Sequence, residues 1–205
     1  MAAERPTVPT ADPRGFMPLV GRLWLRAMGW RLDGALPSAP RYVLIVAPHT
    51  TNADFFVGLA AKWALGLRAK WLGKHTLFRG PLGWLLRALG GIPVDRSHPD
   101  GTVEAVLADM EAAPTFVLAL APEGTRRLTE GWKTGFYRIA AAARVPILPV
   151  AFDWSSRKIL LRTLFQPTGE LGEDVSRLRA MYHKGMARHP GLFNDIHDEL
   201  PSGAR

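Results

Sequence analysis

Two apolar patterns alternate along the chain. In one, apolar residues recur every three or four positions, which predicts helices over 18–32, 52–65, 82–89, 100–112, 135–143 and 173–188. In the other, short runs rich in Val, Ile and Leu predict strands over 42–46, 70–73, 92–95, 115–121, 146–152 and 158–165, the last expected at a sheet edge. Because strands alternate with helices, we expect a single α/β domain with a mostly parallel central sheet flanked by helices.

The first predicted helix is amphipathic and precedes this domain. Its apolar face carries Leu19, Val20, Leu23, Trp24 and Ala27, with Arg22 and Arg26 beside it. Such a face suits a helix that lies in a membrane interface, and it equally suits packing against the helix's own domain. We therefore divide the chain into a disordered lead over 1–13, an N-terminal amphipathic and membrane-interfacial helix over 14–36, and the α/β domain over 37–200.

The composition narrows the range of partners. A formal net charge of +8 favours anionic partners such as phosphate esters, acidic lipid headgroups or nucleic acid. The sequence has no zinc-finger spacing, aromatic RNA-binding motif or long Lys/Arg block, so we expect no nucleic-acid partner. The absence of cysteine excludes disulfides, cysteine-ligated zinc and any covalent intermediate on cysteine. No stretch approaches the roughly 18 apolar residues that cross a bilayer, so we expect no transmembrane helix.

His49 and Asp54 are the first candidate catalytic residues. They flank a predicted strand-to-helix junction, five residues apart. A carboxylate at this spacing can hold the imidazole in one tautomer and leave its other nitrogen free to accept a proton. The alternative is structural, because Thr51 and Asp54 also fit a capping box at the start of the helix.

A glycine-containing loop at 122–126 follows the predicted strand over 115–121. Gly124 and Thr125 offer backbone N–H groups and a hydroxyl, and Arg126 offers a planar fork for phosphate. Glu123 is unusual in such a loop and would instead position Arg126 or a backbone amide. An ordinary strand-end turn is the alternative interpretation of this segment.

Two further cations are candidate phosphate ligands. Arg96 follows the strand predicted over 92–95, and Lys133 lies at the start of the helix predicted over 135–143. Solvated surface charges are the alternative for both. The histidines outside the candidate pair show no metal-ligand spacing, and the sequence holds no nucleophile-elbow, P-loop or dinucleotide-binding glycine motif. We therefore expect no metal and no bound cofactor.

Four blocks in order give the sequence a family resemblance. They are His49 to Asp54, Gly91 to Arg96, Pro122 to Arg126 and Val145 to Pro149, and together they resemble the glycerolipid acyltransferase superfamily, which includes the 1-acylglycerol-3-phosphate acyltransferases. The form of the first block, together with residues 132–137, looks like a compact bacterial branch. Pro48 and Pro93 depart from the residues usual in the first two blocks.

The resemblance implies roles for individual residues. His49 and Asp54 would be the catalytic pair, and Arg96 would contact the acceptor phosphate. The third block, Glu123 through Arg126, would serve the same phosphate. Val145, Pro146 and Ile147 would form a wall for the acyl chain, whereas taken in isolation this apolar run is a core strand.

The predicted activity follows from these assignments. We expect an O-acyltransferase that moves a fatty acyl group from acyl-CoA or acyl carrier protein to a lysophospholipid, with 1-acylglycerol-3-phosphate giving phosphatidic acid. Glycerol-3-phosphate or a lyso-aminolipid is an alternative acceptor, and a thioesterase or a non-catalytic membrane-surface binder is an alternative function. We expect peripheral contact with an anionic membrane surface, at the cytoplasmic face of the cell membrane.

Overall fold

The computed structural model describes residues 15–94 and 99–196, so the predicted lead over 1–13 and the candidate Arg96 lie outside the described residues. The helices are α1 (Phe16–Ala27), α2 (Ala53–Ala64), α3 (Gly80–Ala88), α4 (Pro99–Ala112), α5 (Gly135–Ala142) and α6 (Leu171–Arg179), with short 3₁₀ turns η1 (His75–Leu77), η2 (Lys184–Met186) and η3 (Pro190–Leu192). The strands are β1 (Arg31–Asp33), β2 (Arg41–Ala47), β3 (Ala69–Lys74), β4 (Gly91–Val94), β5 (Phe116–Leu120), β6 (Ile147–Asp153) and β7 (Lys158–Leu161).

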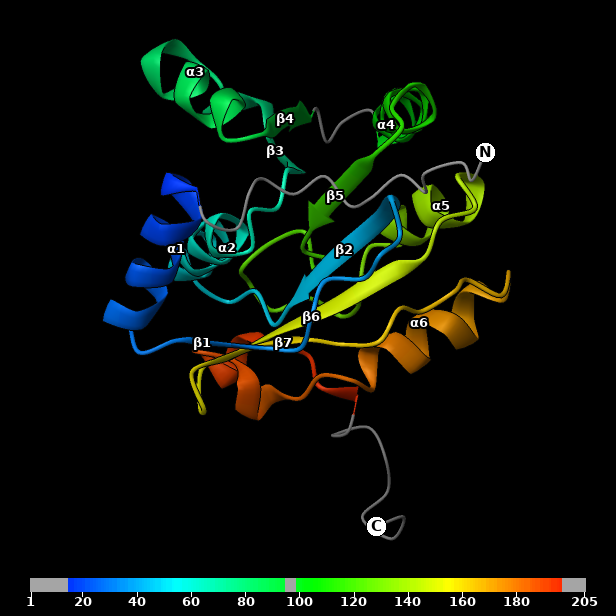
Figure 1. Ribbon diagram of the computed structural model, residues 1–205. Helices are drawn as coiled ribbons and strands as arrows, with labels where there is room; N and C mark the ends of the chain where they lie inside the picture. The colour runs from blue at the N-terminus through cyan, green and yellow to red at the C-terminus, as the bar shows by residue number, and fades with distance from the viewer. Residues whose placement is uncertain (1–14, 95–98, 197–205) are drawn as a thin grey trace, which may run out of the picture.

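The strands form one seven-stranded sheet in the order β1-β7-β6-β2-β5-β3-β4 (Figure 1). Every neighbouring pair is parallel except β6 and β7, which are antiparallel. This arrangement confirms the predicted α/β fold with a mostly parallel sheet. Its strand register brings the carboxyl ends of β2 and β5 to one edge of the sheet, where α/β folds place their ligands.

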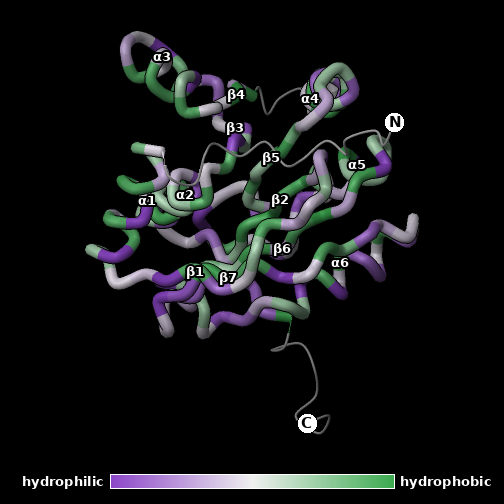
Figure 2. Tube along the Cα trace, in the orientation of Figure 1, coloured by the Kyte–Doolittle hydropathy of each residue, from purple (hydrophilic) through white to green (hydrophobic). Residues whose placement is uncertain are grey.

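The central strand β2 separates two cores. Tyr42 and Leu44 point into a cluster shared with α1 and α2, whereas Val43 and Ile45 point into a cluster shared with α4 and α5. Side chains alternate in this way because successive residues of a strand face opposite sides. Helices cover both faces of the sheet in Figure 1, and the central strands are hydrophobic along their length in Figure 2, as expected for a parallel sheet buried on both sides.

The helix expected over 18–32 ends earlier, at Ala27. The N–H of Trp30 donates to the carbonyl of Leu25, and Gly29 adopts a φ of +75°, so the helix closes with a left-handed residue. The chain then continues as β1, a strand that the apolar pattern did not predict. Since β1 pairs with β7, β1 occupies the sheet edge that was expected for the strand over 158–165.

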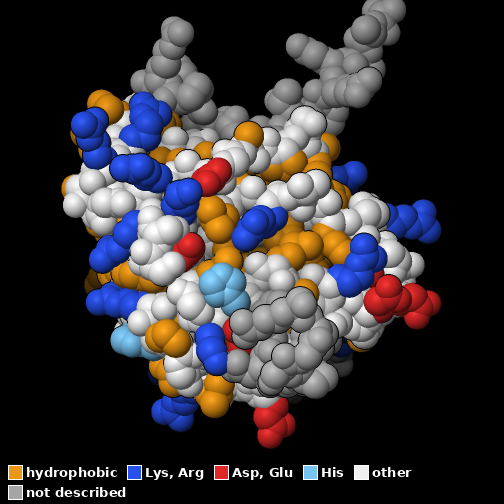
Figure 3. Space-filling view, turned by 90° about the horizontal axis from the view of Figure 1, so that it is seen from below, with side chains coloured by type: hydrophobic (Ala, Val, Ile, Leu, Met, Phe, Trp, Pro, Cys, Tyr) orange, Lys and Arg blue, Asp and Glu red, His pale blue; other side chains and the backbone are white. Residues whose placement is uncertain are grey.

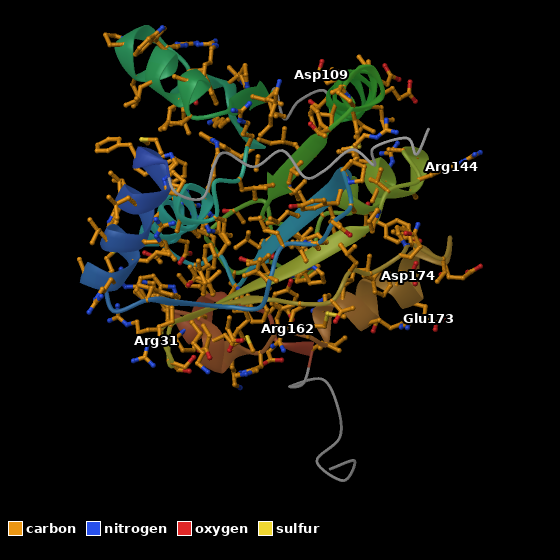
Figure 4. The ribbon with its side chains drawn as sticks, viewed as in Figure 1. Arg31, Asp109, Arg144, Arg162, Glu173 and Asp174 are labelled. Carbon is orange, nitrogen blue, oxygen red and sulfur yellow. The ribbon has the colours of Figure 1, made fainter. Side chains whose placement is uncertain are left out.

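The last helix is also shorter than the predicted 173–188. Asp174, labelled with the exposed Glu173 in Figure 4, fixes α6 to the domain. The carboxylate of Asp174 accepts hydrogen bonds from the hydroxyl of Tyr137 at 2.7 Å and from the backbone N–H of Thr168 at 2.7 Å. Beyond Arg179 the chain leaves the helix, because Tyr182 turns into a third apolar cluster with Ala47 at the end of β2.

Candidate active site

His49 lies in the loop between β2 and α2, at the carboxyl end of a central strand. Its Nδ1 is 3.2 Å from Oδ2 of Asp54, in the first turn of α2. The carboxylate side chain is 1% exposed, while the imidazole is 21% exposed. Since Nδ1 faces the carboxylate, Nε2 is the nitrogen left for a substrate proton.

Asp54 is surrounded by hydrogen-bond donors. Its Oδ2 accepts the backbone N–H of Thr51 at 2.9 Å, and its Oδ1 accepts the indole N–H of Trp154 at 2.8 Å. The Thr51 contact is the carboxylate half of the capping box considered above, so the capping role and the contact with His49 coexist. Two fixed donors and the ring nitrogen together orient the carboxylate toward the imidazole.

Trp154 was not predicted as a site residue. It follows β6 and packs its ring edge-on against Trp30, with a centroid distance of 4.9 Å. The guanidinium groups of Arg157 and Arg188 lie 5.3 and 4.7 Å from the Trp154 ring centre. The residue stands 100 positions from Asp54 in the chain, and no motif links the two, so only the folded chain identifies the contact.

Glu123 anchors the loop that carries His49. Both of its carboxylate oxygens accept the backbone N–H of His49, at 2.9 and 3.1 Å. Burial raises the pKa of Glu123 to about 8, the His49 N–H opposes that rise, and the charge of Asp54 adds to it. A buried acceptor that faces a backbone amide is poorly suited to bind phosphate. The phosphate role implied for Glu123 therefore does not fit its geometry, and the backbone-positioning role does.

The rest of the third block lies against Lys133. Gly124 has a φ of +68°, and a Cβ added there would lie 2.9 Å from Cδ of Lys133. The backbone N–H of Lys133 donates to the carbonyl of Pro122 at 2.8 Å, and Thr125 accepts the N–H of Arg127 through its hydroxyl oxygen. The side chains of Arg126 and Lys133 are exposed. Because Glu123 contacts His49, this cationic loop adjoins the pair formed by His49 and Asp54.

The apolar run at 145–147 is far from the pair. Ile147 starts β6 at the level of Val43, whereas His49 lies beyond Ala47, which is level with Ala151. Val145 and Ile147 are buried in the core cluster under α4 and α5. The structure therefore places Val145, Pro146 and Ile147 at the opposite end of the sheet, with Val145 and Ile147 in the core, and does not bring them to the site as an acyl-chain wall.

Comparisons with known proteins identify the family of this chain. The family described as Acyltransferase matches residues 35–153, which include both the His49 loop and the Glu123 loop. The chain belongs to this family. The match confirms the predicted superfamily.

Three relatives are each named as a 1-acyl-sn-glycerol-3-phosphate acyltransferase. The chain is 31% identical over 159 residues to the chloroplastic 1-acyl-sn-glycerol-3-phosphate acyltransferase BAT2 of Brassica napus, a match covering 73% of this chain and 42% of the relative. It is 28% identical over 203 residues to LPAT1 of Arabidopsis thaliana, covering 90% and 53%. It is 31% identical over 131 residues to the Escherichia coli enzyme, covering 59% and 51%. The chain thus spans about half the length of the relatives it matches.

A solved structure shares the fold of this chain. It is the 1-acyl-sn-glycerophosphate acyltransferase PlsC of Thermotoga maritima, with a TM-score of 0.54 and 17% sequence identity. The similarity covers 78% of this chain and 76% of that protein. At this level of identity the likeness concerns the architecture alone.

Proposed function

We propose that this acyltransferase moves a fatty acyl group from acyl-CoA or acyl carrier protein to the free hydroxyl of 1-acylglycerol-3-phosphate, giving phosphatidic acid. The observation that carries the proposal is the contact between His49 and the buried carboxylate of Asp54, with the ring partly open to solvent. The names of the relatives support the choice of acceptor.

In the proposed reaction, the acceptor hydroxyl oxygen attacks the carbonyl carbon of the thioester. His49 Nε2 takes the hydroxyl proton as the C–O bond forms, and Asp54 stabilises the imidazolium. The tetrahedral intermediate then breaks its C–S bond. The leaving thiolate takes the proton from the imidazolium, which returns His49 to its starting form. Both substrates bind together, because the transfer is direct.

The cations near the pair provide the proposed phosphate grip. Arg126 follows Glu123 in the loop that contacts His49, and Lys133 lies alongside Gly124. Lys and Arg side chains are also spread across the face of the molecule seen from below in Figure 3. Holding the phosphate there would fix the acceptor hydroxyl near His49, and such orientation supplies much of the rate enhancement in two-substrate reactions.

The membrane part of the proposal concerns α1. Phe16, Leu19 and Leu23 are exposed on its outer face, while Gly21 and Leu25 pack its inner face against the domain. The outer face is therefore available to lie in a bilayer surface, where lysophospholipids reside. Within residues 15–94 and 99–196, no helix is both long and apolar enough to cross a bilayer. We propose peripheral attachment through α1, at the cytoplasmic face of the cell membrane.

The test is an acyl-transfer assay that follows thiol release from acyl-CoA. The protein contains no cysteine, so a thiol reagent reports only the released coenzyme A. His49→Ala should lower turnover by roughly 10²–10⁴-fold, the usual contribution of a general base. His183→Ala, which changes an exposed histidine beyond α6, serves as the matched control.

The same assay separates the alternatives. Replacing 1-acylglycerol-3-phosphate with glycerol-3-phosphate or a lyso-aminolipid identifies the preferred acceptor. Thiol release of equal rate without any acceptor would indicate a thioesterase. Near-normal turnover of His49→Ala would remove His49 from the mechanism.

A further inference from the structure

The outer face of α3 is strongly apolar. Trp84 is 74% exposed, Leu82 is 54% exposed and Leu85 is 47% exposed, and Leu77 in the preceding turn η1 is 48% exposed. In Figure 1, α3 stands above the body of the domain, away from the covered faces of the sheet. An exposed cluster of this kind is typical of a surface that contacts a membrane or another protein.

Contacts on the opposite side of α3 hold the helix against the domain without using this face. On its inner side α3 packs on its own turn: Gly83 lies against the backbone of Phe78, and Arg87 donates to the carbonyl of Phe78 at 3.0 Å. The Arg87 guanidinium also lies 5.4 Å from the centre of the Phe78 ring. Because these contacts hold α3 in place, its exposed Leu and Trp side chains remain free for a partner.

Charge identifies the kind of partner. From Phe55 to Val94 the sequence contains no Asp or Glu, while it contains six cations, namely Lys62, Arg68, Lys70, Lys74, Arg79 and Arg87. Residues 15–32 likewise contain three arginines and no acidic residue. In the segments that carry the exposed apolar faces of α1 and α3, every charged residue is thus a Lys or an Arg. Apolar side chains with Trp, bordered by Lys and Arg, match an anionic lipid surface.

The two helices are also neighbours. Met17 and Pro18 of α1 and Ala88 at the end of α3 line one hollow of about 360 Å³. Lys62 and Arg68 line the same hollow, and Lys62 donates to the carbonyl of Leu89 just after α3. A bilayer that met the start of α1 would therefore lie close to α3. A single extended lipid surface could contact both helices at once, and this favours a membrane over a small protein partner.

We propose that α3, with η1, is a second membrane-contacting element that acts together with α1 on anionic bilayers. This inference rests on the membrane attachment proposed above and extends it to a helix on the other side of the catalytic loop in sequence. Two separate contacts would fix the orientation of the domain on the bilayer, whereas one helix would leave it free to rotate about a single attachment.

The first experiment is co-sedimentation of the full chain with vesicles of phosphatidylcholine and phosphatidylglycerol in a three-to-one ratio. L82S/L85S should weaken partitioning by roughly 10- to 100-fold, since two leucines lose their apolar burial. L171S/L192S removes two exposed leucines from α6 and η3 and is the matched control, which should bind like the unchanged protein. Equal binding of both variants would overturn the proposal.

A second measurement does not depend on how strongly the variant binds. Because the protein has no cysteine, Leu82→Cys and Leu171→Cys each accept a single environment-sensitive fluorophore. The emission of the label at position 82 should shift to the blue with anionic vesicles, and that at position 171 should not. A label at position 82 that shifts only with an acidic carrier protein, or on self-association without lipid, would show that α3 binds a protein instead.

These readouts are separate from acyl transfer. An active enzyme whose α3 label stays in water refutes only this inference. A protein whose α3 inserts but which transfers no acyl group to any acceptor refutes only the proposed function.

Discussion

Asp54→Asn tests the hydrogen-bond geometry around the proposed catalytic pair, His49 and Asp54. The carboxylate accepts from two fixed donors, the Thr51 N–H at Oδ2 and the Trp154 indole N–H at Oδ1. An asparagine has one oxygen and one NH₂ group, so its NH₂ must face one of these donors. A buried donor left without an acceptor costs about 1–3 kcal/mol.

The two orientations of the amide have different consequences for His49. If the oxygen stays with Trp154, the NH₂ donates to Nδ1, the proton moves to Nε2, and the ring can no longer act as a base. If the oxygen stays with Thr51, Nδ1–H keeps an acceptor and Nε2 stays free, but Trp154 loses its partner. We expect Asp54→Asn to lower kcat/KM by roughly 10²–10⁴-fold, because the inactive tautomer is populated and the imidazolium loses its charge partner.

Trp154→Phe then gives opposite effects in two backgrounds. In the unchanged protein it removes a donor to Asp54 and should lower activity. In Asp54→Asn it removes the donor that opposes the active orientation, so activity should rise by about 5- to 150-fold, the equivalent of 1–3 kcal/mol. The cavity left by the smaller ring is common to both backgrounds and cancels in the double-mutant cycle. The assay is the initial rate of thiol release, with thermal unfolding as a control for folding. Equal losses in both backgrounds would refute the reasoning.

Three other predictions concern the Glu123 loop. The pKa of Glu123 is about 8 in the folded protein, above the value of 4.5 for an unperturbed Glu, so the native state keeps a proton that the unfolded state has released. The free energy of unfolding should therefore fall as pH rises from about 4.5 to 8, by up to about 1.4 kcal/mol per pH unit. Glu123→Gln should flatten this pH dependence in urea titrations. Equal pH dependence in both proteins would contradict the raised pKa of Glu123. Gly124→Ala should destabilise the protein by about 1–2 kcal/mol in thermal unfolding, because of the +68° φ, and no change would show that the loop relaxes. Arg126→Ala and Lys133→Ala should raise KM for the acceptor more than for acyl-CoA, and a rise confined to the donor would remove them from the phosphate site.

The sequence alone determined the local part of the site. His49 and Asp54 flank one strand-to-helix junction, so their spacing is enough to predict that the two side chains meet. The apolar runs of β2, β5 and β6 likewise fixed their positions as buried strands, since a parallel strand covered on both faces is apolar along its whole length.

Only the tertiary structure decided which distant residues support that pair. Trp154 and Glu123 reach the loop from the ends of β6 and β5, and this requires the parallel register of three strands. The three-residue strand β1 is too short for a periodic pattern and is defined by its pairing with β7. The run at 145–147 would be apolar at either end of a strand. Its composition therefore could not show that it lies at the end of the sheet away from His49. Spacing along a chain fixes contacts within one turn, whereas contacts between elements depend on strand order and direction, which residue composition does not encode.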